Sequence, residues 1–149
     1  MEKVKAATIG VFHHDCQTSL SSEKFPGIRL EQLSPVVYLS KKPQKIDYSL
    51  LWEINADSPS EVEEYLGYVK KDKKTIKLHV LEKNDLNALI LLRFRGASSS
   101  YDTVLSSGVT YSNHITAQAG YEIHSVVAPE PSRLGKMLSE LSSIGDIKI

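Results

Sequence analysis

Cysteine is scarce in this chain, with Cys16 as the single example among 149 residues. One cysteine excludes a disulfide within the chain and fits the reducing cytoplasm, where thiols stay free. Long hydrophobic runs are also missing, because no stretch approaches the roughly 18 apolar residues that a membrane-spanning helix needs. The first residues enter a strand pattern directly, without the shape of a signal peptide. We therefore expect a cytoplasmic protein with no membrane partner.

A surplus of charge is missing as well, since Lys+Arg and Asp+Glu are 18 each and the formal net charge is +0. Binding to the nucleic-acid backbone needs a clustered positive surplus, so these residues alone are poorly suited to grip DNA. The motifs GxSxG, HExxH and GxGxxG are also absent from the sequence, and each of them marks a common catalytic or cofactor site. The sequence therefore favours a protein that is not an enzyme.

Two stretches of the sequence, Trp52–Leu78 and Tyr121–Ile149, follow the same order of strand, helix and strand. The first helix begins at Ser58-Pro59-Ser60-Glu61, which has the residues of a capping box with proline in the first turn. In both stretches apolar residues recur at i, i+3, i+4 and i+7, the spacing of one helical face. These residues are Val62, Tyr65, Leu66 and Val69 in the first stretch and Leu134, Met137, Leu138 and Leu141 in the second. The match predicts a duplicated α/β unit.

The remaining segments complete two βαββαβ halves. The pattern predicts strands at 4–12, 28–39, 48–56, 75–82, 87–95, 109–118, 121–128 and 146–149, with short helices near 16–20 and 101–105. Each half then has the order of a ferredoxin-like fold. We predict an α+β protein of two tandem βαββαβ repeats, 1–84 and 85–149. Because one half buries little core by itself, the two are expected to pack as one unit.

The densest polar cluster, His13-His14-Asp15-Cys16, lies where the first strand meets the first helix. Such junctions favour ligands because the N–H groups at a helix start are free. His13, Asp15 and Cys16 are metal-ligand types, and a thiolate with imidazole suits zinc or copper. No CxxC or HxxxH spacing is present, so two other interpretations stay open. One is an organic ligand site, and the other is a structural role with Asp15 as a helix cap and Cys16 as a small buried side chain.

The corresponding junction of the second half reads RFRGASSS at 93–100. Arg93 and Arg95 alternate with one residue between them and so share a strand face. Together with Gly96 and the serine amides they could hold a carboxylate or a phosphate, but a solvated strand face is the favoured explanation of the two arginines. Glu53 and Glu122 occupy matched strand positions, and we expect that match to follow from duplication rather than from acid–base chemistry.

Three features together resemble a known family. They are the strand followed by His13, Asp15, Cys16 and Ser19, the repeated α/β unit, and the ending LSELSSIGDIKI at 138–149. They are similar to the N-terminal regulatory domain of archaeal helix-turn-helix transcription regulators, the bacterio-opsin activator-like group. The sequence departs from that group at Gln17, where an aromatic residue is common. The predicted fold also resembles tandem ACT-like modules, which bind amino acids and other small effectors.

The resemblance implies a regulatory domain that senses a small-molecule or metal effector and forms a homodimer. It implies contact with DNA only through a helix-turn-helix segment that is not among these residues. The effector contacts would be His13, His14, Asp15 and Cys16 on one loop and Arg93, Arg95 and Gly96 on the other. Two alternatives remain, namely a small metal- or thiol-dependent enzyme built around His13, Asp15 and Cys16, and a free-standing interaction module that pairs by sheet edges.

Overall fold

The computed structural model describes residues 4–43, 45–96 and 99–149, and within these ranges the chain forms ten strands and four helices. The strands are β1 (Lys5–His13), β2 (Arg29–Gln32), β3 (Val37–Lys42), β4 (Lys45–Asn55), β5 (Thr75–Lys83), β6 (Asn87–Gly96), β7 (Thr110–Tyr111), β8 (Thr116–Gln118), β9 (Tyr121–Ala128) and β10 (Gly145–Lys148). The helices are α1 (Gln17–Lys24), α2 (Pro59–Lys71), α3 (Ser100–Ser106) and α4 (Pro131–Ser142). None of the described helices is long and apolar enough to cross a membrane.

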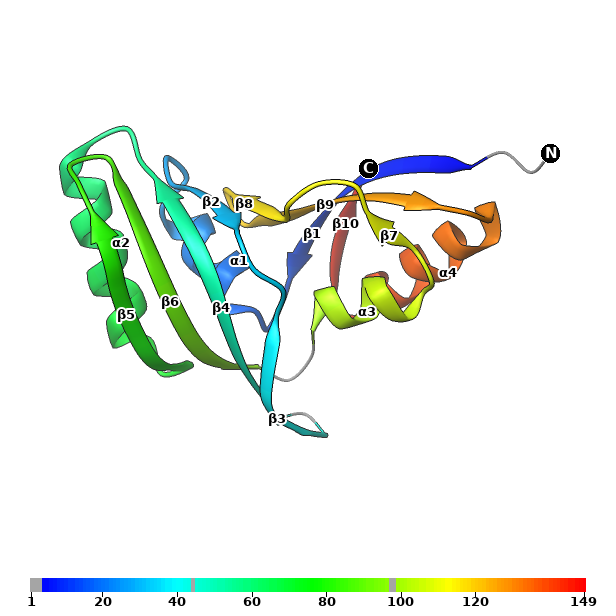
Figure 1. Ribbon diagram of the computed structural model, residues 1–149, viewed down its shortest axis with the longest axis horizontal. Helices are drawn as coiled ribbons and strands as arrows, with labels where there is room; N and C mark the ends of the chain where they lie inside the picture. The colour runs from blue at the N-terminus through cyan, green and yellow to red at the C-terminus, as the bar shows by residue number, and fades with distance from the viewer. Residues whose placement is uncertain (1–3, 44, 97–98) are drawn as a thin grey trace.

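The strands form one sheet in the order β10-β1-β9-β8-β2-β4-β6-β5, with β3 added beside β4 and β7 beside β9. Every pairing in the described part is antiparallel. The short pairing of β2 with β8 joins two groups of strands. We call β2, β4, β6 and β5 with α1 and α2 the α2 half, and β8, β9, β1 and β10 with α3 and α4 the α4 half. These halves lie at opposite ends of the molecule (Figure 1).

The two halves exchange strands. The unit β4-α2-β5 leaves a gap between its strands, and β6 fills that gap by pairing with both. The unit β9-α4-β10 leaves a similar gap, and β1, from the start of the chain, fills it. After β1 the chain enters α1, which lies between the halves and contacts β8 and β9 as well as α2, and after β6 it enters α3, which packs against α4. The chain therefore crosses between the halves twice, once after β1 and once after β6.

The predicted architecture of two tandem βαββαβ repeats is wrong, because the protein is a single ten-stranded, sheet-dominated fold. A tandem arrangement would have placed β1 beside β4 and β6 beside β9. Sequence periodicity identifies strands by their alternation, but it carries no information about which apolar strand fills which gap. Since β1 and β6 are similar in length and hydrophobicity, either strand could fill either gap as far as local sequence is concerned. Packing of the whole molecule decided between them.

One face of the sheet carries both cores. Along a row of cross-strand partners, Val11, Glu122, Ala117, Leu30, Ile54 and Ala88 lie on this face, since directly paired residues point to the same side. The buried face of α2, made by Val62, Tyr65, Leu66 and Val69, packs over the α2 half. Met137 and Leu141 of α4, with Leu134 and Leu138 partly buried beside them, cover the α4 half. The predicted apolar faces of both long helices are confirmed.

Helix starts follow the sequence in one case and depart from it in another. Ser58 is the N-cap of α2, its Oγ accepts from the Glu61 N–H at 3.4 Å, and Pro59 lies in the first turn, as predicted. At α1 the interpretation of Asp15 as the helix cap is wrong. Cys16 occupies the N-cap position there and makes no capping hydrogen bond. The free N–H groups at the start of α1 therefore lack a side-chain acceptor at that position.

Candidate functional site

The two crossovers meet at a small cavity. The volume open to the centres of water molecules is about 40 Å³. This is enough room for a few waters or for one ion. His13, Asp15 and Cys16 line it from the segment after β1, and Gly96, Ser99 and Ser100 line it from the segment after β6. Glu122 of β9 and the apolar side chains Val36, Tyr48, Leu50, Trp52, Phe94 and Tyr101 complete much of the wall. An occupant would therefore touch both crossovers.

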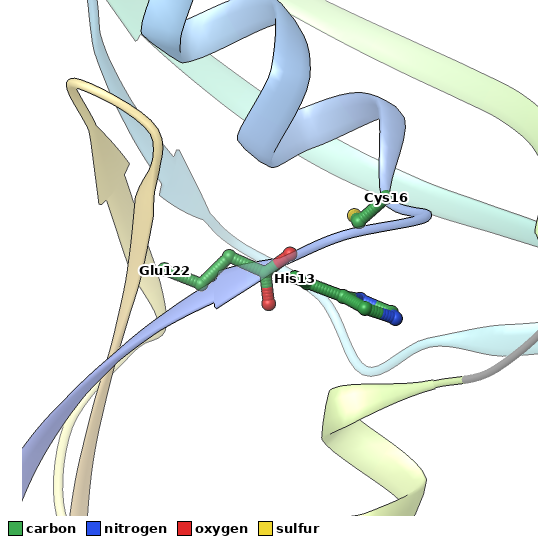
Figure 2. A group of neighbouring side chains, drawn as sticks. All are labelled: His13, Cys16 and Glu122. Carbon is green, nitrogen blue, oxygen red and sulfur yellow. The ribbon is translucent and has the colours of Figure 1, made fainter. Parts of the chain in front are cut away.

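Three potential metal ligands gather in this wall. A ring nitrogen of His13, the Sγ of Cys16 and a carboxylate oxygen of Glu122 all lie within 4.8 Å of one another. His13 is 2% exposed, Cys16 9% and Glu122 5%. Figure 2 shows the three side chains converging from the end of β1, the turn before α1 and the neighbouring strand β9. We call this group the His-Cys-Glu cluster.

Local backbone structure fixes His13 and Cys16. His13 is the last residue of β1 and continues the inward alternation of Ile9 and Val11. Its N–H donates to Ser19 Oγ at 3.2 Å, and its carbonyl accepts from the Cys16 N–H at 3.1 Å in a tight turn. This turn brings the side chains at positions 13 and 16 to the same side of the chain as α1 begins.

Glu122 is a charged side chain in an otherwise apolar row, between Val11 of β1 and Ala117 of β8. Its carboxylate accepts a hydrogen bond from Ser100 Oγ at 2.6 Å. His124, two residues along β9 and fully buried, places Nε2 3.4 Å from the same carboxylate. Tyr111 Oη lies 2.7 Å from His124 Nδ1 and holds the ring. In the described part of the chain, no lysine or arginine forms an ion pair with Glu122.

Burial dominates the electrostatics of the cluster. It lowers the pKa of His13 below its usual value, against the opposing charges of Glu122 and Asp15. It raises the pKa of the Cys16 thiol well above normal, and the negative charge of Glu122 adds to this shift. For Glu122, burial opposes ionisation, but the hydrogen bond with His124 and the neighbouring imidazoles outweigh it and lower its pKa to about 2. The cluster at neutral pH thus holds a neutral thiol, an uncharged His13 and a buried carboxylate.

The structure separates the other residues that the sequence predicted as contacts. Asp15 lines the cavity and pairs with Lys74, whose Nζ also donates to the Asp15 carbonyl at 3.0 Å. His14 points the other way and lies 3.2 Å from Asp146 at the surface. Gly96 joins the cavity wall.

Arg93 and Arg95 lie on the opposite face of the sheet, because β6 turns the side chains of Leu92 and Phe94 inward. Arg93 donates there to Asp47, from Nε at 3.1 Å and from Nη2 at 2.8 Å. Arg95 is exposed at this face. The two arginines therefore share a face with each other but not with Gly96 and the cavity.

Sequence reasoning missed Glu122 and His124 as site residues. The signal was present in β9, where Glu122, His124, Val126 and Ala128 alternate in phase. A glutamate and a histidine in the phase of buried valine and alanine are costly unless they are partnered. Such a pair therefore indicates a buried polar site. The sequence analysis instead attributed the position of Glu122 to duplication.

Comparison with known proteins adds no family to these observations. The chain matches no protein-family model, no curated protein and no solved structure.

Proposed function

We propose that this chain is the effector-sensing domain of a cytoplasmic transcription regulator whose DNA-binding segment lies outside these residues. The observation that supports this proposal is the cavity lined by both crossovers. One crossover leads from β1 of the α4 half through α1 to β2 of the α2 half, and the other leads from β6 of the α2 half to α3 of the α4 half. An effector bound between them would favour one arrangement of the two halves, and that population shift is the signal passed onward.

Two further observations agree with a sensing role. The formal charge of +0 leaves no surplus for gripping DNA with this part of the protein. The sequence resemblance to bacterio-opsin activator-like regulators, carried in part by the His13–Cys16 segment, likewise implies a regulatory domain. We expect the domain to be a homodimer, which light scattering of the purified chain would test.

A thiol-dependent enzyme has less support. Cys16 is buried, and burial raises its pKa. Because the thiolate is the nucleophile, a thiol that stays protonated reacts slowly.

The experiment that tests the proposal is a thermal-shift screen with metal ions, amino acids and nucleotides. A true effector raises the melting temperature by binding the folded state. The screen is repeated on Val36→Phe, which fills the cavity, and on the matched control Val37→Phe, whose side chain is 53% exposed.

We expect an effector to stabilise the wild type and Val37→Phe but not Val36→Phe. Hydrogen exchange should also slow in the segments after both β1 and β6 when the effector binds. A stabilising compound that acts equally on both variants, or protects one crossover alone, would contradict the proposal.

A further inference from the structure

We propose that the His-Cys-Glu cluster is a binding site for one divalent transition-metal ion of the zinc class. This inference rests on the proposed function, since it names the effector, or its anchor, at the same cavity. The donors are a ring nitrogen of His13, the Sγ of Cys16 and a carboxylate oxygen of Glu122. Imidazole, thiolate and carboxylate are the three side-chain ligands that zinc takes in proteins.

The spacing of the donors suits a small ion. Zinc–ligand bonds of about 2.0–2.3 Å place tetrahedral ligands about 3.5 Å apart. The three atoms already lie within 4.8 Å of one another. Closing the site therefore requires each pair to contract by at most about 1.3 Å, which side-chain rotations at Cys16 and Glu122 supply. All three residues also line the cavity, so a remaining coordination position faces it.

Charge selects a divalent ion over a monovalent one. Glu122 is a buried carboxylate that forms no ion pair with a lysine or an arginine in the described part of the chain, and His124 Nε2 lies 3.4 Å from it. When a metal binds, the Cys16 thiol loses its proton to solvent and the sulfur takes a metal–sulfur bond in its place. Two negative charges, from Cys16 and Glu122, then balance one dication, and neutral His13 donates a lone pair.

The surroundings hold the carboxylate ready for a cation. Ser100 Oγ donates to Glu122 Oε2 at 2.6 Å, and His124 Nε2 lies 3.4 Å from the same oxygen. His124 is itself fixed by Tyr111, 2.7 Å from its Nδ1. Outer hydrogen bonds of this kind orient a metal ligand and are part of the site. His124 lies outside the cluster of three and is assigned here as a positioning residue.

The test uses the untagged chain and the metal ions alone. Equilibrium dialysis against Zn²⁺ should give one ion per chain. Co²⁺ should bind in its place and show a thiolate-to-cobalt charge-transfer band with the visible spectrum of a tetrahedral site. Because the chain has a single cysteine, that band assigns Cys16 as a ligand without any variant.

Variants locate the other two ligands. His13→Gln, Cys16→Ala and Glu122→Gln should each weaken Zn²⁺ binding by more than about a hundredfold. His14→Gln is the matched control, because His14 is the adjacent, exposed histidine and faces away from the cavity. Its affinity should equal that of the wild type. Circular dichroism confirms that each variant is folded.

The assignment is overturned if Co²⁺ shows no thiolate band, or if His14→Gln loses the ion while folded Cys16→Ala keeps it. The experiments give different results when the metal assignment is wrong and when the sensing function is wrong. If Zn²⁺ does not bind but an organic compound stabilises the chain in a way that Val36→Phe blocks, the metal assignment falls and the sensing role stands. If Zn²⁺ binds at the cluster but leaves hydrogen exchange at both crossovers unchanged, the site stands and the sensing role falls.

Discussion

At the scale of single residues, the buried carboxylate of Glu122 is the feature that the rest of the site has to accommodate. A charge inside a core is tolerated only with hydrogen bonds or an opposite charge around it. Ser100 Oγ donates a hydrogen bond of 2.6 Å to it, and His124 Nε2 lies 3.4 Å from the same oxygen. Because Ser100 is the first residue of α3, its hydrogen bond with Glu122 ties β9 to the start of α3.

Ser100→Ala should therefore lower the free energy of unfolding of the metal-free chain by about 1.5–3 kcal/mol, the usual range for a hydrogen bond to a charged group. Urea denaturation measures this difference. Ser106→Ala is the control, because Ser106 lies on the same helix and bonds only the nearby Thr103 carbonyl at the surface. Its variant should change the free energy by less than about 0.5 kcal/mol. Equal costs for the two variants would contradict the role given to Ser100.

Arg93 offers a second prediction, this time of pH dependence. Its hydrogen bonds lower the pKa of Asp47 below the usual value, against the opposing effect of burial. Between the folded and the unfolded pKa, the unfolded chain binds more protons, so stability rises with pH. The contribution is complete above the unfolded value of about 4 and disappears as the pH falls through the lower folded value.

Arg93→Gln should accordingly lower the stability slightly at neutral pH and by less near pH 2, and the effect is small because Arg93 is 44% exposed. Urea denaturation at both pH values gives the two free energies. Arg95→Gln, at the exposed neighbour on the same face, should show a smaller difference between the two. A cost for Arg93→Gln that stays constant with pH would rule out this account of the pair.

At the scale of secondary-structure elements, the two long helices begin in different ways although both have proline in the first turn. Ser58 caps α2 through its side chain, whereas Glu130 at the same position of α4 makes no capping hydrogen bond. Comparing the two helices therefore distinguishes the contribution of the N-cap to helix stability from the contribution of tertiary packing. Packing of the apolar face stabilises both helices, and a cap adds to α2 alone.

Ser58→Ala should lower the free energy of unfolding by about 1 kcal/mol, the usual cost of losing an N-cap. Glu130→Ala, the matched change at α4, should cost less than about 0.5 kcal/mol, because it removes only the exposed ion pair with Arg133. Thermal or urea unfolding of the two variants side by side decides the matter. A larger loss at Glu130 than at Ser58 would show that the cap geometry is not what stabilises α2.

At the scale of the whole molecule, the exchanged strands join the two halves into one folding unit. The core of the α2 half includes β6, and the core of the α4 half includes β1. In chain order the α2 half runs without a break from α1 to β6, whereas the α4 half is divided, with β1 before that segment and the rest after it. Unfolding of either half would release the chain segments that hold the other half together, so we expect the two halves to unfold in one transition.

Trp52, the single tryptophan, reports on the α2 half because it lies in that core at 3% exposure. Leu141→Ala changes the core of the α4 half and should destabilise the protein by about 2–5 kcal/mol. If the halves unfold together, the free energies of unfolding measured by Trp52 fluorescence and by far-ultraviolet circular dichroism will both fall by that same amount. Leu105→Ala, at a position 42% exposed, serves as the control. A Trp52 transition left unchanged by Leu141→Ala would show that the halves unfold separately.

The sequence by itself determined the local elements and part of the site. Helical spacing located α2 and α4 and their buried faces, since burial of one stripe is a short-range requirement that each segment meets alone. The sequence also predicted that His13 and Cys16 lie at the junction between the first strand and the first helix. Tertiary structure alone decided that β1 and β6 change places and that Glu122 completes the cluster. Strand pairing depends on contacts between distant segments, and either apolar strand satisfies the local pattern. Only the packed molecule selects one arrangement, and with it the cavity between the crossovers.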